Sequence, residues 1–143
     1  MNFLEMNIDD YDEMYELWSN TEGMGLRSLD DSKEGISKFL NRNPNTNFIC
    51  RIDNKLVGAI LCGNDGRRGY IYHAVVHKDF QREKIGTLLV EKVIEALDRE
   101  GIKKVALVVY SNNLNGNQFW ESLGFIDRPD LVYRNLSIDK NNI

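Results

Sequence analysis

The residues best suited to chemistry lie in one stretch, from Val75 to Leu89. An apolar segment typical of a strand ends at Val76, a polar turn follows, and a long amphipathic pattern begins near Ile85. This layout places the free N–H groups of a helix N-terminus at the end of a strand, which is a natural anion site. The stretch also gathers basic side chains, namely His77, Lys78, Arg82 and Lys84. It therefore predicts a site for a small anionic ligand, and the alternative is a solvated basic turn.

The composition limits the classes of protein to which the chain can belong. A length of 143 residues predicts a single domain spanning residues 1–143, with room for a hydrophobic core. The hydrophobic content of 42% and the charged content of 28% are ordinary for a globular protein. The formal net charge is −4, so the whole molecule offers no basic surface for a nucleic-acid backbone. We therefore expect no nucleic-acid partner.

The cysteines and the first residues bear on the compartment. Cys50 and Cys62 lie in apolar, strand-like segments without metal-type spacing, so we expect small buried core residues rather than a disulfide or a metal site. Asp9, Asp10 and Asp12 stand where a signal peptide would need an apolar run, and no apolar segment has the length to span a bilayer. A cytoplasmic protein without a membrane segment is the expectation.

The elements before the central stretch read as two helices and then three strands, after a short first strand near residues 3–6. Helical spacing predicts a helix over residues 11–18 and a second one that starts at Asp31, and a glycine-containing loop separates them. Strands are predicted at residues 48–52, 56–62 and 69–76. Because the turns between them are too short for crossovers, we expect an antiparallel meander.

The elements after the turn read as helix, strand, helix and strand. The longest helix is predicted at residues 85–99, and the apolar run 105–110 is typical of a central strand buried on both faces. A short helix that holds Phe119 follows, and residues 131–138 alternate as a last strand. The strand–helix–strand order makes the strands around the long helix parallel neighbours. The sequence thus predicts an α+β domain in which about four helices flank a mixed sheet.

Two short motifs flank the long helix and the buried strand. The turn contains Gln81-Arg82-Glu83-Lys84-Ile85-Gly86, and the short helix contains Asn113, Gly116, Phe119 and Trp120. Together with the order of elements along essentially the whole chain, they resemble the GNAT superfamily of N-acetyltransferases. In that family the turn has glycine where Lys84 stands, and tyrosine is common where Trp120 stands. The resemblance implies a GNAT-like fold with a mostly antiparallel mixed sheet of six to seven strands.

The resemblance also implies a co-substrate, acetyl-CoA, and no metal. Its pantetheine arm is expected between the strands that end at Val76 and Tyr110, and its pyrophosphate on the N–H groups of the turn. Glycine at position 84 would permit positive φ. Lys84 surrenders that freedom, and its ammonium either contacts a phosphate or is solvated. The cofactor-binding residues carried over from the family are Val75, Val76, Lys78, Gln81, Arg82, Glu83, Lys84, Ile85, Gly86, Thr87, Asn113 and Phe119. Helix capping is the alternative role for the asparagine, and core packing is the alternative for Phe119.

Acetyl transfer to an amine also needs routes for protons. The family's usual acid toward the thiolate is the tyrosine that Trp120 replaces here, and an indole N–H does not ionise usefully. The candidates for the base are Tyr72 and His73 in the strand and Glu22 in the glycine-containing loop. Histidine is the side chain best suited to take up a proton near neutral pH. Strand alternation places Tyr72 and His73 on opposite faces of the sheet, so we expect at most one of them to face the acceptor.

The leading interpretation is an N-acetyltransferase that moves an acetyl group from acetyl-CoA to a primary amine by direct attack in a ternary complex. The alternative is an acyl-CoA-binding sensor or interaction module without turnover, which the departures at Lys84 and Trp120 would allow. The acceptor is expected to be a small-molecule or peptide amine, and Arg27 either binds a carboxylate on it or pairs with Asp30 or Asp31. The protein is expected to be a monomer or a homodimer.

Overall fold

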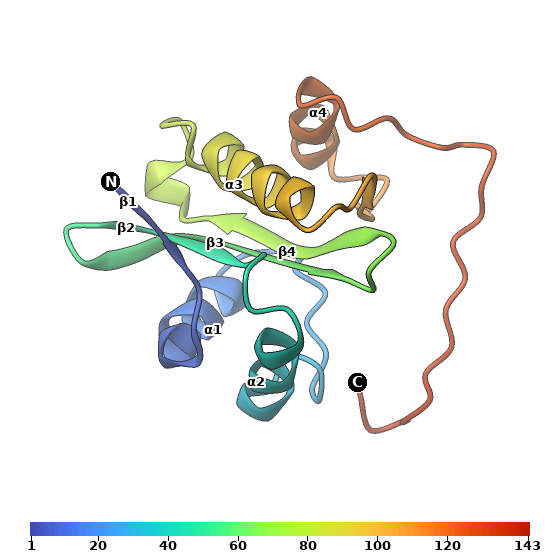
Figure 1. Cartoon of the computed structure of the whole chain (residues 1–143), viewed down its shortest axis with the longest axis horizontal. Coiled ribbons are helices and arrows are strands. Elements are labelled where there is room, and N and C mark those ends of the chain that lie inside the picture. The colour runs from blue at the N-terminus through green and yellow to red at the C-terminus, as the bar shows by residue number, and fades with distance from the viewer.

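The computed structural model describes residues 1–143 as a sheet with helices on both faces (Figure 1). The strands are β1 (Asn2–Glu5), β2 (Phe48–Ile52), β3 (Lys55–Asn64), β4 (Gly69–Val76) and β5 (Val105–Ala106). The α-helices are α1 (Tyr11–Ser19), α2 (Lys33–Arg42), α3 (Ile85–Arg99) and α4 (Leu114–Ser122). Two short 3₁₀ helices precede α1 and follow β4, namely η1 (Ile8–Asp10) and η2 (Lys78–Phe80).

The sheet has the order β1-β2-β3-β4-β5. The first four strands form an antiparallel meander, and β5 runs parallel to β4 after the α3 crossover, as predicted. Asp53 and Asn54 join β2 to β3 with φ of 50° and 65°. Two residues with positive φ suit a tight hairpin turn whose twist matches that of the strands. The mixed, mostly antiparallel sheet is confirmed, with five strands instead of the predicted six to seven.

Two hydrophobic cores hold the helices against the sheet. α1 and α2 cover one face, and α3 and α4 cover the other (Figure 1). Ile85, Leu89 and Val93 recur at helical spacing and bury the inner side of α3, while Met14 and Trp18 of α1 fill the opposite core. The helix predicted at residues 85–99 therefore has the predicted bounds. No helix combines the length and the apolar character that a membrane crossing requires.

The second helix starts later than predicted. Ser32 is the N-cap of α2, and its hydroxyl accepts a hydrogen bond from the N–H of Gly35 at 3.0 Å. Asp31, the predicted start, accepts a hydrogen bond from the backbone N–H of Arg27 at 2.7 Å instead. The carboxylate of Asp31 therefore closes the loop before the helix and leaves the capping to the next residue.

The prediction of a central strand at residues 105–110 is wrong in position and length. Only the two residues of β5 pair with β4, and β5 is the edge of the sheet. Side chains along the segment alternate between half-buried and exposed, and Val108 and Tyr110 are 57% and 59% exposed. The physical reason is that no strand covers the outer side of β5, because residues 131–138 do not form the predicted last strand.

The end of the chain forms an extended strap, residues 126–140, which runs from α4 along one side of the molecule to the α1–α2 loop (Figure 1). No hydrogen bond joins residues 126–140 to residues 1–125. The following residues return to the body, where the N–H of Ser28 donates to the carbonyl of Ile143 at 2.8 Å. The N–H groups of Leu29 and Asp30 both donate to Oδ1 of Asn142 at 3.0 Å. The strap is therefore held at its two ends.

Candidate active site

The turn between η2 and α3 presents free hydrogen-bond donors. The backbone N–H groups of residues 82–87 donate to no acceptor within the protein. The first helical hydrogen bond of α3 runs from the N–H of Leu88 to the carbonyl of Lys84 at 3.1 Å. N–H groups at a helix N-terminus carry the positive end of the helix dipole. The turn therefore has the donor geometry of an anion site.

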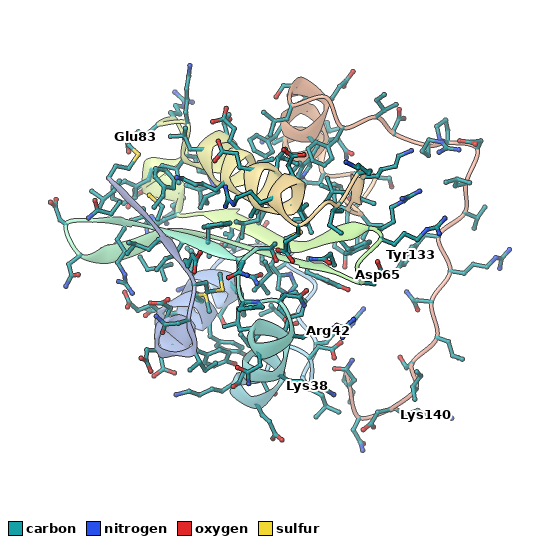
Figure 2. The ribbon with its side chains drawn as sticks, in the orientation of Figure 1. Lys38, Arg42, Asp65, Glu83, Tyr133 and Lys140 are labelled. Atoms are coloured by element: carbon teal, nitrogen blue, oxygen red, sulfur yellow. The ribbon has the colours of Figure 1, made fainter.

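Basic side chains surround these donors. Lys78, Arg82 and Lys84 are exposed, and none of them takes part in an ion pair. Glu83 lies on the same exposed turn, at the end of α3 where the helix begins (Figure 2). The long cationic side chains remain free to meet an anion that binds to the backbone. The structure thus brings the predicted charged residues of the turn together on one exposed surface, while Ile85 is buried.

Lys84 adopts a glycine-like backbone conformation. It is the N-cap of α3, with φ of 62° and ψ of 19°, in the left-handed region. The expectation that lysine would surrender this conformation is wrong, because the backbone takes positive φ with a lysine side chain in place. For a residue with a Cβ, the left-handed conformation costs roughly 1–2 kcal/mol. The turn therefore keeps the shape that a glycine would allow and stores local strain in it.

The last residues of β4 have an open edge, since β5 pairs only with the first two residues of that strand. The N–H of His77 donates to the carbonyl of Val57 on the β3 side at 2.7 Å. Because backbone groups alternate in direction along a strand, the N–H and carbonyl of Val76 point to the open side. The side chain of Gln81 donates to that carbonyl at 3.2 Å. The free N–H of Val76 faces the gap between β4 and β5.

The second motif organises the start of α4. The side chain of Asn113 caps the helix, because its Oδ1 accepts from the N–H of Gly116 at 2.9 Å. A Cβ on residue 116 would lie 2.5 Å from the Asn113 side chain, which explains the small residue three positions later. Asn117, which the sequence analysis missed, donates from Nδ2 to the carbonyls of Tyr110 and Asn113 at 3.1 and 2.8 Å. Because Asn117 follows the cap by four residues, its position on the helix could have predicted this contact.

The aromatic pair of α4 has two different neighbourhoods. Phe119 meets the first turn of α3, where a Cβ on Gly86 would lie 3.2 Å from the phenylalanine ring and 3.7 Å from Val76. Trp120 packs between other rings, with its centroid 5.0 Å from those of Phe119 and Phe125. Both rings pack against the core on the α3 face, and the phenylalanine also contacts the first turn of α3.

Tyr72 and His73 do not lie on opposite faces of the sheet, so that prediction is wrong. Tyr72 packs against Phe39 of α2, with ring centroids 5.6 Å apart, and His73 packs against Trp18 of α1 at 5.1 Å. Both helices cover the same face (Figure 1). The cause is a β-bulge, since Leu61 pairs with His73 while Cys62 pairs with residue 71, so Tyr72 is the extra residue of β4.

His73 is tied into the protein interior. Its Nε2 lies 2.7 Å from Oδ1 of Asp31, and the two side chains are 10% and 7% exposed. Asp31 also binds the N–H of Arg27, and its carbonyl accepts from the hydroxyl of Tyr11 at 2.6 Å. The Nδ1 of His73 and the Nε1 of Trp18 are buried without a partner. This pair fixes the α1–α2 loop to β4 and leaves the imidazole buried.

The other two candidates for the base are accessible. Tyr72 is 57% exposed, and burial of part of its phenol raises its pKa above the ordinary value, with Asp30 acting in the same direction. The phenol therefore stays protonated near neutral pH and is better suited to donate than to accept a proton. Glu22 is exposed in the α1–α2 loop, and no hydrogen bond or ion pair engages its carboxylate. Of the three candidates for the base, Glu22 is thus the one that is both exposed and without a partner within the protein.

The sequence is similar to one known family over most of its length. The family model described as the acetyltransferase (GNAT) family matches residues 10–125, which is more than half of the chain. A curated acetyltransferase of Pectobacterium atrosepticum is 30% identical over 105 residues, covering 73% of each chain. The chain therefore belongs to the GNAT family of acetyltransferases.

Solved structures agree on the fold. The PaiA N-acetyltransferase of Thermoplasma acidophilum, in complex with coenzyme A, matches with a TM-score of 0.73 and 17% identity over 85% of this chain and 87% of that one. An aminoglycoside acetyltransferase from an uncultured soil metagenomic sample matches with a TM-score of 0.76 and 20% identity over 96% of each chain. At these identities the likeness establishes the GNAT fold.

Proposed function

We propose that the protein is an acetyl-CoA-dependent N-acetyltransferase that moves an acetyl group to a primary amine by direct attack in a ternary complex. The observation that carries the proposal is the run of free N–H groups at residues 82–87, beside the open edge of β4, in a member of the GNAT family. A coenzyme A complex of a protein with the same fold supports the choice of donor.

The proposed binding mode uses the backbone. The N–H groups of residues 82–87 hold the pyrophosphate, and the basic side chains of Lys78, Arg82 and Lys84 add attraction to the phosphates. The pantetheine arm lies along the open edge near Val75 and Val76, and Phe119 and the Asn113 cap bound the gap on the α4 side. We propose the same cofactor-binding role for the other residues that the family resemblance implies.

Acetyl-CoA supplies an activated thioester. The amine nitrogen forms a bond to the acetyl carbon, the carbon–sulfur bond breaks, the thiolate leaves, and the amine loses one proton. The free N–H of Val76 is placed to polarise the thioester carbonyl. Cys50 and Cys62 are buried, and burial raises the pKa of both thiols, that of Cys62 to about 12. Since a thiolate is the reactive form of cysteine, this supports direct attack over an acyl-cysteine intermediate.

We assign the base role to Glu22, acting directly or through water, because its carboxylate is free and exposed. The Glu22→Gln variant keeps the shape of the side chain and removes the base. A general base contributes about 100-fold or more, so we expect kcat to fall by that order. An unchanged kcat in this variant would contradict the assignment.

The first test of the proposal is release of the free thiol of coenzyme A when the full chain meets acetyl-CoA and a panel of primary amines. Turnover supports the enzyme, and thermal stabilisation by acetyl-CoA without turnover of any amine supports the sensor instead. If acetyl-CoA neither stabilises the protein nor is consumed, both interpretations fail. A panel of the matching alcohols, in which a hydroxyl group replaces each amine, is the control for N-transfer.

The proposed function also includes a class of acceptor and a cellular compartment. We propose a small-molecule or peptide amine, in keeping with the aminoglycoside acetyltransferase that shares the fold. We also propose the cytoplasm as the place of action, because two buried free thiols suit a reducing compartment.

A further inference from the structure

The middle of the α1–α2 loop, residues 22–26, has little backbone support of its own. Hydrogen bonds anchor the loop at its two ends, and none forms at residues 22–26. Gly23 and Gly25 have φ of 76° and 64°, which glycine adopts without steric strain and which leaves the chain free to move. The segment that carries Glu22 therefore depends on packing contacts for its position.

Tyr110, at the end of the apolar run 105–110, supplies one of these contacts. A Cβ on Gly25 would lie 3.5 Å from the hydroxyl oxygen of Tyr110, and apart from the neighbours of the glycine in the chain no other atom lies within 4 Å of that position. Met24 and Leu26 on either side of the glycine pack against the core beneath α1 and α2. The phenol thus joins the loop to the β5 side of the sheet.

The direction of the Tyr110 side chain follows from strand alternation. Val105 and Leu107 pack against the core on the α3 face. Successive side chains of an extended segment point to opposite faces, so Val108 and Tyr110 point to the face of α1 and α2. They are 57% and 59% exposed, and the hydroxyl of Tyr110 forms no hydrogen bond within the protein. The ring therefore does not fill a core, and its contact is with the loop.

The backbone of Tyr110 is fixed from the other side of the gap. Its carbonyl accepts from the N–H of Asn113 at 3.0 Å and from Nδ2 of Asn117 at 3.1 Å. Both donors belong to the start of α4, which bounds the gap between β4 and β5. The tyrosine therefore connects a part of the cofactor side that is held by hydrogen bonds to a part of the acceptor side that is not.

We propose, resting on the proposed acetyl transfer, that Tyr110 is a positioning residue for the reaction. Its phenol holds residues 22–26 at the open end of the gap between β4 and β5. Glu22 precedes the contact at Gly25 by three residues, so the same contact keeps its carboxylate where it takes up the proton of the amine. Tyr110 exchanges no proton itself, and it acts on the rate because a misplaced catalytic group is a poor one.

Backbone relaxation of the labelled full chain tests the contact without any acetyl transfer. We expect order parameters of about 0.85 for residues 22–26 in the unsubstituted protein and below about 0.6 in Tyr110→Ala. Val108→Ala, on the same face and 57% exposed, is the matched control and should leave them unchanged. A loop that is already mobile in the unsubstituted protein, or that stays ordered in a folded Tyr110→Ala protein, would overturn the inference. Thiol release would still stand in either case, so this failure is distinct from failure of the proposed function.

Kinetics with an amine that the protein acetylates test whether the effect runs through Glu22. Tyr110→Ala should lower kcat about tenfold or more and change KM for acetyl-CoA by less than about threefold. In a Glu22→Gln background the same substitution should have little further effect, because the two residues act through one group. Losses that multiply in the double variant would overturn the assignment. A Tyr110→Phe protein with an ordered loop and the same loss of kcat would make the phenol a proton donor and would also overturn it.

Discussion

The cofactor side and the acceptor side of the site are built in different ways. The cofactor side uses backbone N–H groups of consecutive residues, 82–87, on one turn and one strand end. The proposed acceptor side uses side chains that come from distant parts of the chain, namely Glu22 in the α1–α2 loop and Tyr72 in β4. Backbone recognition tolerates a change of side chain, which is why Lys84 can keep the glycine-like turn. Side-chain recognition changes with every substitution, so we expect the acceptor side to set the specificity of this protein.

The largest expected effect is on stability, and it comes from breaking the buried pair of His73 and Asp31. His73→Ala leaves the buried carboxylate of Asp31 without its partner, and such losses cost about 3 kcal/mol. Denaturant unfolding measures the loss of free energy of unfolding. His77→Ala is the control, with a smaller loss of about 1 kcal/mol from its capping of η2. A His73→Ala protein that stays stable but loses kcat/KM would instead make the histidine a base.

The next largest effect is expected on the binding of coenzyme A. Gly86→Val places a branched side chain against the ring of Phe119, where even a Cβ would lie at 3.2 Å. Overpacking of this kind costs about 1–3 kcal/mol, so we expect coenzyme A binding to weaken by about tenfold to a hundredfold. Calorimetric titration measures it. Glu95→Val, on the exposed side of the same helix, is the matched control and should bind normally. Normal binding in Gly86→Val would remove the first turn of α3 from the site.

A smaller effect separates the two roles of Lys84. Lys84→Gly relieves the left-handed strain and should raise the free energy of unfolding by about 1 kcal/mol. If the backbone alone binds the pyrophosphate, coenzyme A affinity should change by less than about threefold. Lys84→Ala removes the ammonium and keeps the strain, so it reports on the charge alone. A tenfold loss of affinity in both variants would show that the ammonium contacts a phosphate.

The smallest expected effect concerns the tyrosine that the family commonly has at position 120. Trp120→Tyr should change kcat by less than about twofold, because the side chain at this position packs between Phe119 and Phe125. Trp120→Phe is the control and should behave in the same way. A tenfold rise in kcat in the tyrosine variant alone would mean that a hydroxyl here reaches the leaving thiolate.

Elements with strong local signals could be predicted from the sequence. The bounds of α3 and β4 follow from a clear helical period, a polar turn and an alternating strand, and the meander follows from short connections. The anion turn was predictable for the same reason, since its donors belong to consecutive residues. Asn113 was predictable as a cap, because capping depends on residues three positions apart.

Features that depend on pairing across the sheet could not be predicted. The bulge at Tyr72 is a property of how β3 and β4 register, and one extra residue turns two side chains to the same face. The run 105–110 is as apolar as a central strand, yet its burial depends on whether residues 131–138 pair with it. The partnership of His73 with Asp31 joins residues 42 positions apart, and neither residue carries a local sign of the other.

Amide spectra of the labelled full chain during titration with coenzyme A would test the central claim most directly. The backbone of residues 82–87 should be the pyrophosphate site, so these amide signals should move most, and the amide of Val76 should follow. Signals of Leu29 and Asp30, whose N–H groups are already bound to Asn142, should stay in place. Saturable shifts at residues 82–87 are the predicted result. Binding of coenzyme A that leaves these amides unmoved would contradict the claim.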